Sequence, residues 1–453
     1  MDRSSPLTAL QRFGFGAAPG ELPAVGRDPR AYLAQQLATA RASTGQVPAR
    51  PPLPDTAQGV TLLVDRRTAL AERNAAVTRG ETVPEPSFVR PGAIILRELS
   101  AAAGEASGTT HPLLERLALY WSDHFTTAGA FIGFLGGGME RDAIRPNMLR
   151  PFGELLTATT LHPAMLFYLD NQTSRGPDSP SARGSRGRRG LNENLAREVL
   201  ELHTLGADGG YSQDDVIALA RVLTGWSVDL GQPPGRPERV GFIPEFHEPG
   251  PKTILGKTYS EDGAGQAPAV LRDLALHPAT ARNVTRRLVR HFVGHGFPGL
   301  EARMAAAFQR SGGDLEAVTR ALIADDQAWG PPLKVRPPVE FVFSAARLLG
   351  GLPPQPSLVN ALRAMGQPFW AAPSPKGWPS ENDAWAAPDA IKTRLDWAAE
   401  VATRVGAGVD ARGLLDAAFG PAASAETRQA VARASDGRQA LILLLMSPEF
   451  QRR

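Results

Sequence analysis

Histidine recurs beside carboxylates or lysine in three separate stretches of the sequence, and these side chains bind metal ions and transfer protons. The first stretch is residues 111–125, HPLLERLALYWSDHF. A helical projection places His124 on the same apolar arc as Leu117 and Trp121, with Asp123 outside that arc. A buried imidazole needs a partner for at least one ring nitrogen. We therefore interpret His124 as a hydrogen-bonded core residue or, alternatively, as a ligand of a metal or haem or a catalytic base.

The second stretch is residues 191–206, LNENLAREVLELHTLG. Projected as one helix, it gathers its charged side chains on one face, which includes Arg197, Glu198 and Glu201, and leaves His203 among leucines. Such a face is either solvated surface or the wall of a cleft. In a cleft, neighbouring carboxylates shift each other's pKa and bind a divalent cation or perform acid–base chemistry.

The third stretch is residues 246–257, FHEPGPKTILGK. It holds two of the five lysines in a chain with 49 Lys and Arg residues, so a retained lysine suggests a site that needs a compact ammonium group. The sequence predicts an exposed functional loop in which His247 binds a metal and Lys252 neutralises an anionic substrate. The alternative is a turn that carries solvated charges.

Two further segments are rich in arginine. A predicted helix at 279–293 carries a stripe of Arg286, Arg287, Arg290 and His291, which we expect to pair with the acidic face of 191–205 or with water, or to bind an anion. Residues 172–190 hold five Arg against one Asp. This low-complexity loop is expected to be solvated, with an active-site flap or a polyanion-binding arm as the alternatives.

Composition and motifs exclude several familiar classes. The chain has no cysteine, so any metal would have nitrogen and oxygen ligands, as suits Zn, Fe, Mn or Mg. It contains no P-loop, no G-x-S-x-G and no H-E-x-x-H. No apolar run reaches about 18 residues, so no membrane span is expected. The first residues lack the apolar run of a signal peptide, which favours a cytoplasmic chain unless a partner carries it out of the cell.

Helical periodicity dominates the 453 residues and predicts a mainly α fold. Short strands or extended segments are expected only around 238–260. With no convincing linker, residues 1–453 are predicted to form one multi-helical domain, and residues 336–453 could pack as a C-terminal helical subdomain.

The chain resembles a bacterial family known as domain of unknown function 1800, nearly from end to end. The stretches that carry the resemblance are 10–16 (LQRFGFG), 120–125 (YWSDHF), 162–171 (HPAMLFYLDN), 192–206 (NENLAREVLELHTLG), 210–216 (GYSQDDV), 247–256 (HEPGPKTILG), 376–379 (KGWP) and 447–451 (SPEFQ). The resemblance implies one folding unit and no settled activity. It also implies frequent export and a sulfatase-like protein encoded alongside.

These observations lead to one main hypothesis, an enzyme for a small anionic or polar substrate. In it the three histidine stretches converge on one cleft, where His124, His203 and His247 bind a divalent metal or act as bases. The carboxylates of Glu198 and Glu201 assist them, while Arg197 and Lys252 hold the anion. The alternatives are a non-catalytic helical partner of a sulfatase-like protein, haem ligation by His124 and His203, and, least favoured, nucleic-acid binding through 172–190.

Overall fold

The structure is a computed structural model that describes residues 5–42, 53–82, 84, 88–129, 131–183, 190–231, 238–354 and 357–453. It confirms the predicted mainly α class, because helices account for most of the described chain and strands for a few short pieces. The predicted helix at 279–293 is α14, Pro278–Phe292.

The helices of the first half are α1 (Pro6–Arg12), α2 (Glu21–Val25), α3 (Pro29–Ala42), α4 (Thr56–Thr78), α5 (Pro91–Gly108), α6 (Pro112–His124), α7 (Ile132–Gly138), α8 (Phe152–Thr160), α9 (Pro163–Tyr168), α10 (Pro180–Arg183), α11 (Asn194–Glu198) and α12 (Gln213–Leu223). Those of the second half are α13 (Gln266–Leu276), α14 (Pro278–Phe292), α15 (Pro298–Arg310), α16 (Leu315–Ala324), α17 (Pro338–Leu349), α18 (Leu358–Ala364), α19 (Asp383–Ala386), α20 (Pro388–Val405), α21 (Ala411–Phe419), α22 (Ala425–Ala432), α23 (Gly437–Leu445) and α24 (Pro448–Gln451).

Two histidines, His162 and His277, cap the first turn of a helix with their side chains. His162 precedes Pro163, and its Nδ1 accepts a hydrogen bond from the Ala164 backbone N–H at 3.1 Å. His277 caps α14 in the same way, through the N–H of Ala279 at 3.2 Å. Each cap satisfies an N–H that the first turn leaves unpaired, and the following proline suits the first helical position.

The strands form two antiparallel pairs. Strand β1 (Trp226–Asp229) pairs with β2 (Arg239–Phe242), and β3 (Lys252–Ile254) pairs with β4 (Lys257–Tyr259). Three of the four strands lie in the interval 238–260, where extended structure was predicted. Residues 232–237 between β1 and β2 lie outside the described chain.

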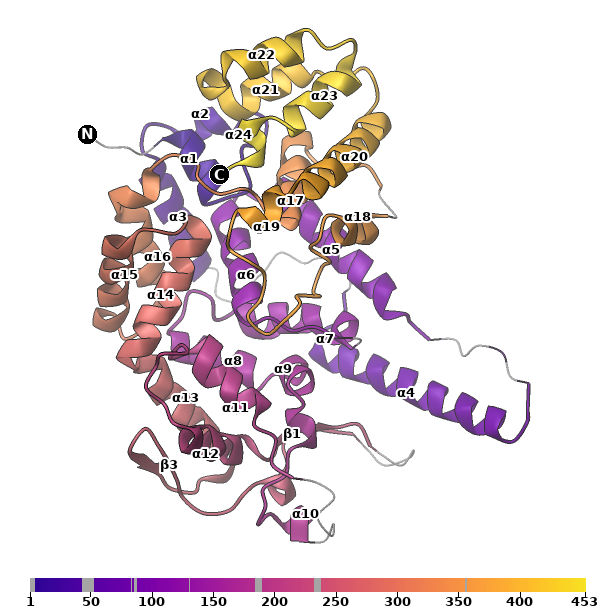
Figure 1. The fold of residues 1–453 in the computed structure, drawn as a ribbon, viewed down its shortest axis with the longest axis vertical. Coiled ribbons are helices and arrows are strands. Elements are labelled where there is room, and N and C mark those ends of the chain that lie inside the picture. Colours follow the sequence, from indigo (N-terminus) through magenta and orange to yellow (C-terminus); the bar gives the residue numbers. More distant parts are fainter. Residues whose placement is uncertain are drawn as a thin grey trace.

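Two hydrophobic clusters form the core. The larger one joins side chains from α1 to α16, and the second joins α17, α18, α20, α21 and α23 with Phe15 and part of α5. Helices α20 to α24 gather at one end of the molecule, while α4 projects from the body (Figure 1). Helix α5 packs along α17 and thus connects the two clusters.

The stretch 191–206 is not one regular helix. It begins as α11 and continues as a π-helical turn, η3, over Val199–His203. A second π-helical turn, η1, spans Met139–Ile144. A π turn holds more residues than an α turn, so side chains beyond it rotate away from a projection drawn at 100° per residue.

None of the helices within the described ranges combines the length and apolar character that a membrane crossing requires.

Candidate active site

A cavity of about 640 Å³ lies between α6, α14, α17 and the segment 367–385. That segment crosses the middle of the molecule in Figure 1. The walls combine charged and aromatic side chains, among them Asp123, Arg287, Arg290, Lys334, Trp370 and Trp378. This size and mixture are typical of pockets that bind small organic molecules.

Asp123, near the end of α6, presents its carboxyl group to this cavity. Its Oδ1 accepts a hydrogen bond from the Trp378 backbone N–H at 2.8 Å. Burial raises the pKa of Asp123 to about 6, although the Trp378 N–H and the nearby Arg287 oppose that rise. A carboxyl group that titrates near neutral pH can both accept and donate a proton under cellular conditions.

Gly377 allows the segment 367–385 to approach Asp123 this closely. Its φ is +85°, and a Cβ built on it would lie 2.7 Å from both the backbone oxygen and Oδ1 of Asp123. A side chain at this position would meet both the left-handed strain and a steric clash. The stretch KGWP therefore fits directly onto the stretch YWSDHF.

Three arginines of α14 form the basic wall of the cavity. Arg286 donates to Oδ1 of Asn283 at 3.0 Å, and Arg287 donates to the carbonyl oxygen of Lys376 at 3.0 Å. Within the described ranges no ion pair to a carboxylate is found for Arg286, Arg287 or Arg290. The expected pairing with the acidic face of 191–205 does not occur there. Instead, guanidinium groups with neutral partners are left to attract an anion.

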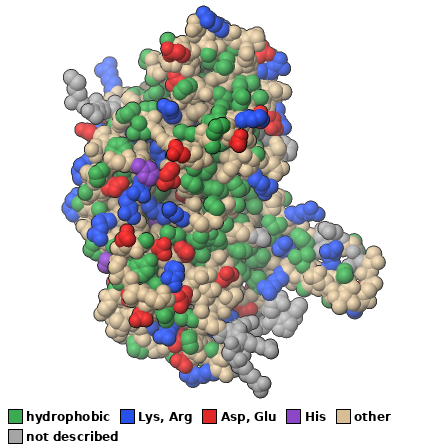
Figure 2. Space-filling model, in the orientation of Figure 1, with side chains coloured by type: hydrophobic (Ala, Val, Ile, Leu, Met, Phe, Trp, Pro, Cys, Tyr) green, Lys and Arg blue, Asp and Glu red, His purple; other side chains and the backbone are tan. Residues whose placement is uncertain are grey.

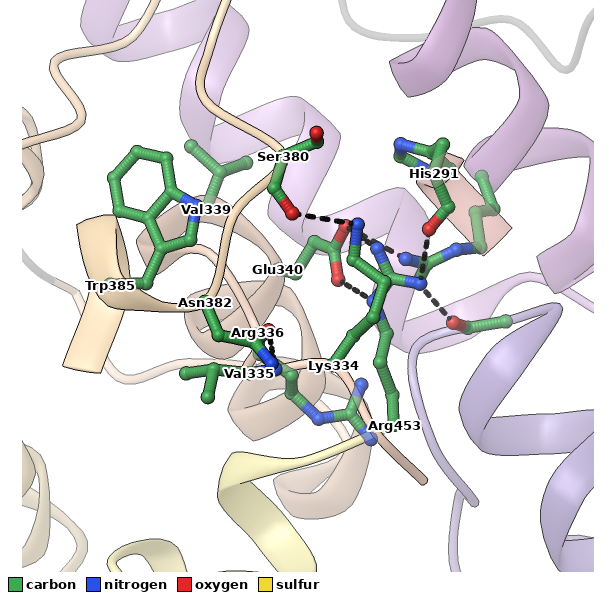
Figure 3. A network of polar contacts seen from close by, with 12 residues as sticks. His291, Lys334, Val335, Arg336, Val339, Glu340, Ser380, Asn382, Trp385 and Arg453 are labelled. Carbon is green, nitrogen blue, oxygen red and sulfur yellow. Dashed lines mark hydrogen bonds and ion pairs between the residues drawn. The ribbon is translucent and has the colours of Figure 1, made fainter. Parts of the chain in front are cut away.

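A buried ionic network supports the same wall (Figure 3). Glu340 of α17 pairs with Arg116 of α6 at 2.7 Å and with Arg453 at 2.5 Å. These two cations hold the pKa of Glu340 far below its usual range. Lys334 lies beside the network and donates to the backbone oxygens of Arg290 at 2.6 Å and Ser380 at 3.2 Å.

Aromatic side chains supply the apolar side of the cavity. Phe369 and Trp370 stack with ring centroids 4.7 Å apart, and Trp378 and Trp385 lie 6.1 Å apart. Trp370 has a φ of +52°, an uncommon conformation for a bulky residue that often marks a functional segment. Figure 2 shows Lys and Arg side chains gathered beside a broad hydrophobic area at the centre of this face.

His124 and His203 lie in the core instead of on the cavity wall. Both are at most 1% exposed, and Nε2 of His124 lies 3.2 Å from the carbonyl oxygen of His203. Their rings are 6.1 Å apart and both contact Phe125, while Trp121 and Phe152 pack around His124. This close packing leaves no slot for a haem. Burial lowers the pKa of both imidazoles, so they are neutral.

His247 and Lys252 are buried as well, against the expectation of an exposed loop. Nδ1 of His247 lies 2.7 Å from the carbonyl oxygen of Thr224, and Nζ of Lys252 donates to the carbonyl oxygen of Glu248. Neither side chain is among the residues described as lining the cavity. The His247 contact ties the loop to Thr224 at the end of α12, while the Lys252 contact lies within the loop itself.

Of the acidic face of 191–205, only Glu201 lines the cavity; Glu198 and Arg197 do not. Arg197 pairs with Glu193 at 2.9 Å, and burial together with the nearby Glu201 raises the pKa of Glu198. Glu201 lies in the π turn η3, whereas Arg197 and Glu198 belong to α11, and the two carboxylates remain close enough to interact.

The predicted convergence of His124, His203 and His247 on one metal has no counterpart in the structure. Across the described ranges, no three His, Asp or Glu side chains gather closely enough to hold a metal ion.

The loop 172–190 is only partly solvated. Arg175 is buried and stacks on the ring of Phe246 at 3.3 Å, and Pro180–Arg183 form α10. Residues 184–189, with the other three arginines, lie outside the described chain.

Residues 8–452 match the family described as Protein of unknown function (DUF1800). The chain belongs to this family. No curated protein and no solved structure matches it. Four of the stretches that resemble DUF1800 meet at the cavity, through Phe15, Asp123, Glu201 and Trp378.

Sequence reasoning missed Asp123 and Lys334, although signals for both were present. Asp123 stands beside the histidine that the helical projection favoured, and Lys334 is one of only five lysines. The rarity of lysine was applied to Lys252, because the stretch 246–257 holds two of the five lysines beside a histidine, whereas Lys334 has no histidine nearby in the sequence.

Proposed function

We propose that this DUF1800 chain is an enzyme that binds an anionic organic molecule in the cavity and transfers a proton to or from it through Asp123. The observation that carries the proposal is a carboxyl group with a pKa of about 6 in the same cavity as three arginines of α14 for which the described residues supply no ion pair. A perturbed acid beside an anion-binding wall is a common arrangement in active sites.

The cavity has a basic wall and an aromatic wall, which supports an anionic organic molecule as the substrate. Arg287 and Arg290 would hold the anionic group of the molecule, while Trp370 and Trp378 would pack against its apolar part. Asp123 of α6 accepts the Trp378 N–H and lies near Arg287, and the turn at Gly377 packs against its carboxyl group. Positioning and proton transfer together account for large rate accelerations in enzymes.

The test is a turnover screen with a panel of phosphate esters, sulfate esters and carboxylates, followed by mass spectrometry. We expect at least one compound to be converted, with Asp123→Asn lowering the rate about 10²- to 10⁴-fold. Asp214→Asn, at an exposed aspartate in the first turn of α12, is the matched control and should retain the full rate. Equal rates for Asp123→Asn and the unmodified protein would overturn the proposal, as would the absence of any conversion.

A second candidate is the role of a non-catalytic partner of a sulfatase-like protein. The projecting helix α4 would supply the contact surface (Figure 1), and Val77 near the end of that helix is 54% exposed. Co-expression and size-exclusion chromatography would test this role. A complex that survives Asp123→Asn but is lost with Val77→Asp supports the partner role, and the absence of a complex contradicts it.

A further inference from the structure

Lys334 is a buried lysine on the wall of the cavity, and the described chain offers it no ion pair. Its side chain is 5% exposed, and Nζ donates to two backbone carbonyl oxygens, those of Arg290 and Ser380 (Figure 3). An ammonium group has three N–H donors, whereas a neutral amine has two. The two carbonyl oxygens therefore satisfy a neutral amine completely and leave its lone pair free.

The charges around Lys334 also favour the neutral amine. Burial and the nearby Arg453 lower the pKa of Lys334 to about 7. The other titratable or charged groups that act on it or feel its charge are Arg116, Asp123, His291, His295, Glu340 and Glu381. Glu340 opposes this effect and raises the pKa of Lys334, although it also pairs with Arg116 and Arg453.

We propose that Lys334 is the nucleophile of this cavity and forms an imine with an aldehyde or ketone that also carries an anionic group. The inference rests on the proposed function, whose arginine wall would hold the anionic group. A desolvated lysine beside other cations is an established way to obtain a nucleophilic amine at neutral pH.

The step needs no oxidant or reductant. The lone pair of Nζ attacks the carbonyl carbon and forms a C–N bond, while the carbonyl oxygen takes a proton from the acid of the cavity, Asp123. The nitrogen then gives one proton back to the Asp123 carboxylate, which leaves a neutral carbinolamine. Asp123 passes this proton to the hydroxyl group, the C–O bond breaks as the nitrogen lone pair forms the C=N bond, and one molecule of water leaves a protonated imine beside the Asp123 carboxylate. The resulting imine withdraws electrons from the neighbouring carbon, so the reaction class would be bond cleavage or formation next to a carbonyl group.

The test uses pyridoxal 5′-phosphate, an aldehyde with a phosphate group and an aromatic ring, on the full chain at pH 7, followed by borohydride reduction. With only five lysines, peptide mass spectrometry can assign every adduct. We expect Lys334 to be modified at least tenfold faster than the exposed Lys392, whose pairing with Asp396 raises its pKa. Phenyl phosphate, which has no carbonyl group, should protect Lys334 by occupying the cavity.

Two variants complete the design. Lys334→Arg keeps a cation, so it should abolish the adduct at this position and still allow phenyl phosphate to bind. Lys392→Arg is the control and should change neither the adduct at Lys334 nor the binding of phenyl phosphate. Adducts spread evenly over the exposed lysines would overturn the inference. If Lys334 stays unmodified while phenyl phosphate still binds, only the imine is wrong. If phenyl phosphate does not bind and Lys334 is unmodified, the anion-binding cavity is wrong as well.

Discussion

Two adjacent residues of one motif, Asp123 and His124, have opposite environments. Consecutive residues of a helix differ by about 100° in direction, so α6 turns His124 into the aromatic core and Asp123 toward the cavity. The sequence predicted the rotation correctly, but a projection of one helix cannot show which side faces a cavity. The sequence favoured His124 for the functional role, whereas Asp123 is the residue that lines the cavity.

Asp123 should make stability depend on pH in a characteristic direction. Because its folded-state pKa, about 6, lies above the usual 3.8, the folded protein binds more protons between these values, and stability falls as pH rises through the window. Asp123→Asn removes this loss. Urea unfolding should therefore show the variant gaining about 2 kcal/mol on the unmodified protein between pH 4 and pH 7. A difference that stays constant over this range would contradict the assignment.

His124 should behave as a packing residue. His124→Ala leaves a cavity among Trp121, Phe125 and Phe152, and we expect it to lower the free energy of unfolding by about 3–4 kcal/mol. At low temperature, where the His124→Ala variant stays folded, it should bind phenyl phosphate with unchanged affinity, as measured by calorimetry. A large loss of affinity for phenyl phosphate with little change in the free energy of unfolding would instead indicate that His124 belongs to the site.

At the scale of elements, the short turn at 376–379 decides the geometry of the site. It has no regular secondary structure, and its place against α6 depends on contacts between residues more than 250 positions apart. Periodicity predicts helices such as α14 because the signal is local. It cannot predict this contact or the π turn η3, nor that Glu201 lines the cavity while Glu198 does not.

Gly377→Ala tests the turn directly. We expect it to cost about 2–4 kcal/mol, because the new Cβ combines left-handed strain with a clash against Asp123. Gly366→Ala is the matched control: its φ is +87°, and nothing lies within 4 Å of a Cβ built there, so only the strain of about 1 kcal/mol remains. Equal losses in the two variants, measured by urea unfolding, would show that the turn does not press on Asp123.

At the scale of the whole molecule, the fold class followed from composition and periodicity, whereas the site did not. The cavity forms where α6, α14, α17 and the segment 367–385 meet, so its residues are scattered from Phe15 to Arg453. Each contributes a weak local signal, and only packing brings them together. The single-domain prediction remains to be tested, because the two hydrophobic clusters also suit a C-terminal subdomain.

We expect cooperative unfolding of the whole chain, because Glu340 of α17, a helix of the second cluster, pairs with Arg116 of α6. Differential scanning calorimetry should give one transition, and Glu340→Gln should lower the free energy of unfolding by about 3–5 kcal/mol by leaving buried arginines unpaired. Asp396→Asn, which breaks an exposed pair with Lys392, should leave the free energy of unfolding nearly unchanged. Two transitions, of which Glu340→Gln shifts only one, would instead establish a separate subdomain.

The central claim is that the basic wall of the cavity binds an anionic organic molecule, and isothermal titration calorimetry with phenyl phosphate at pH 7 tests it most directly. Arg290→Gln removes a guanidinium group from the wall, while Arg282→Gln removes an exposed one from the same helix. A charge-assisted hydrogen bond contributes about 1.5–3 kcal/mol, so Arg290→Gln should weaken binding about 10- to 100-fold. Arg282→Gln should stay within about twofold of the unmodified protein. Equal affinities for the two variants, or no binding to the unmodified protein, would contradict the account.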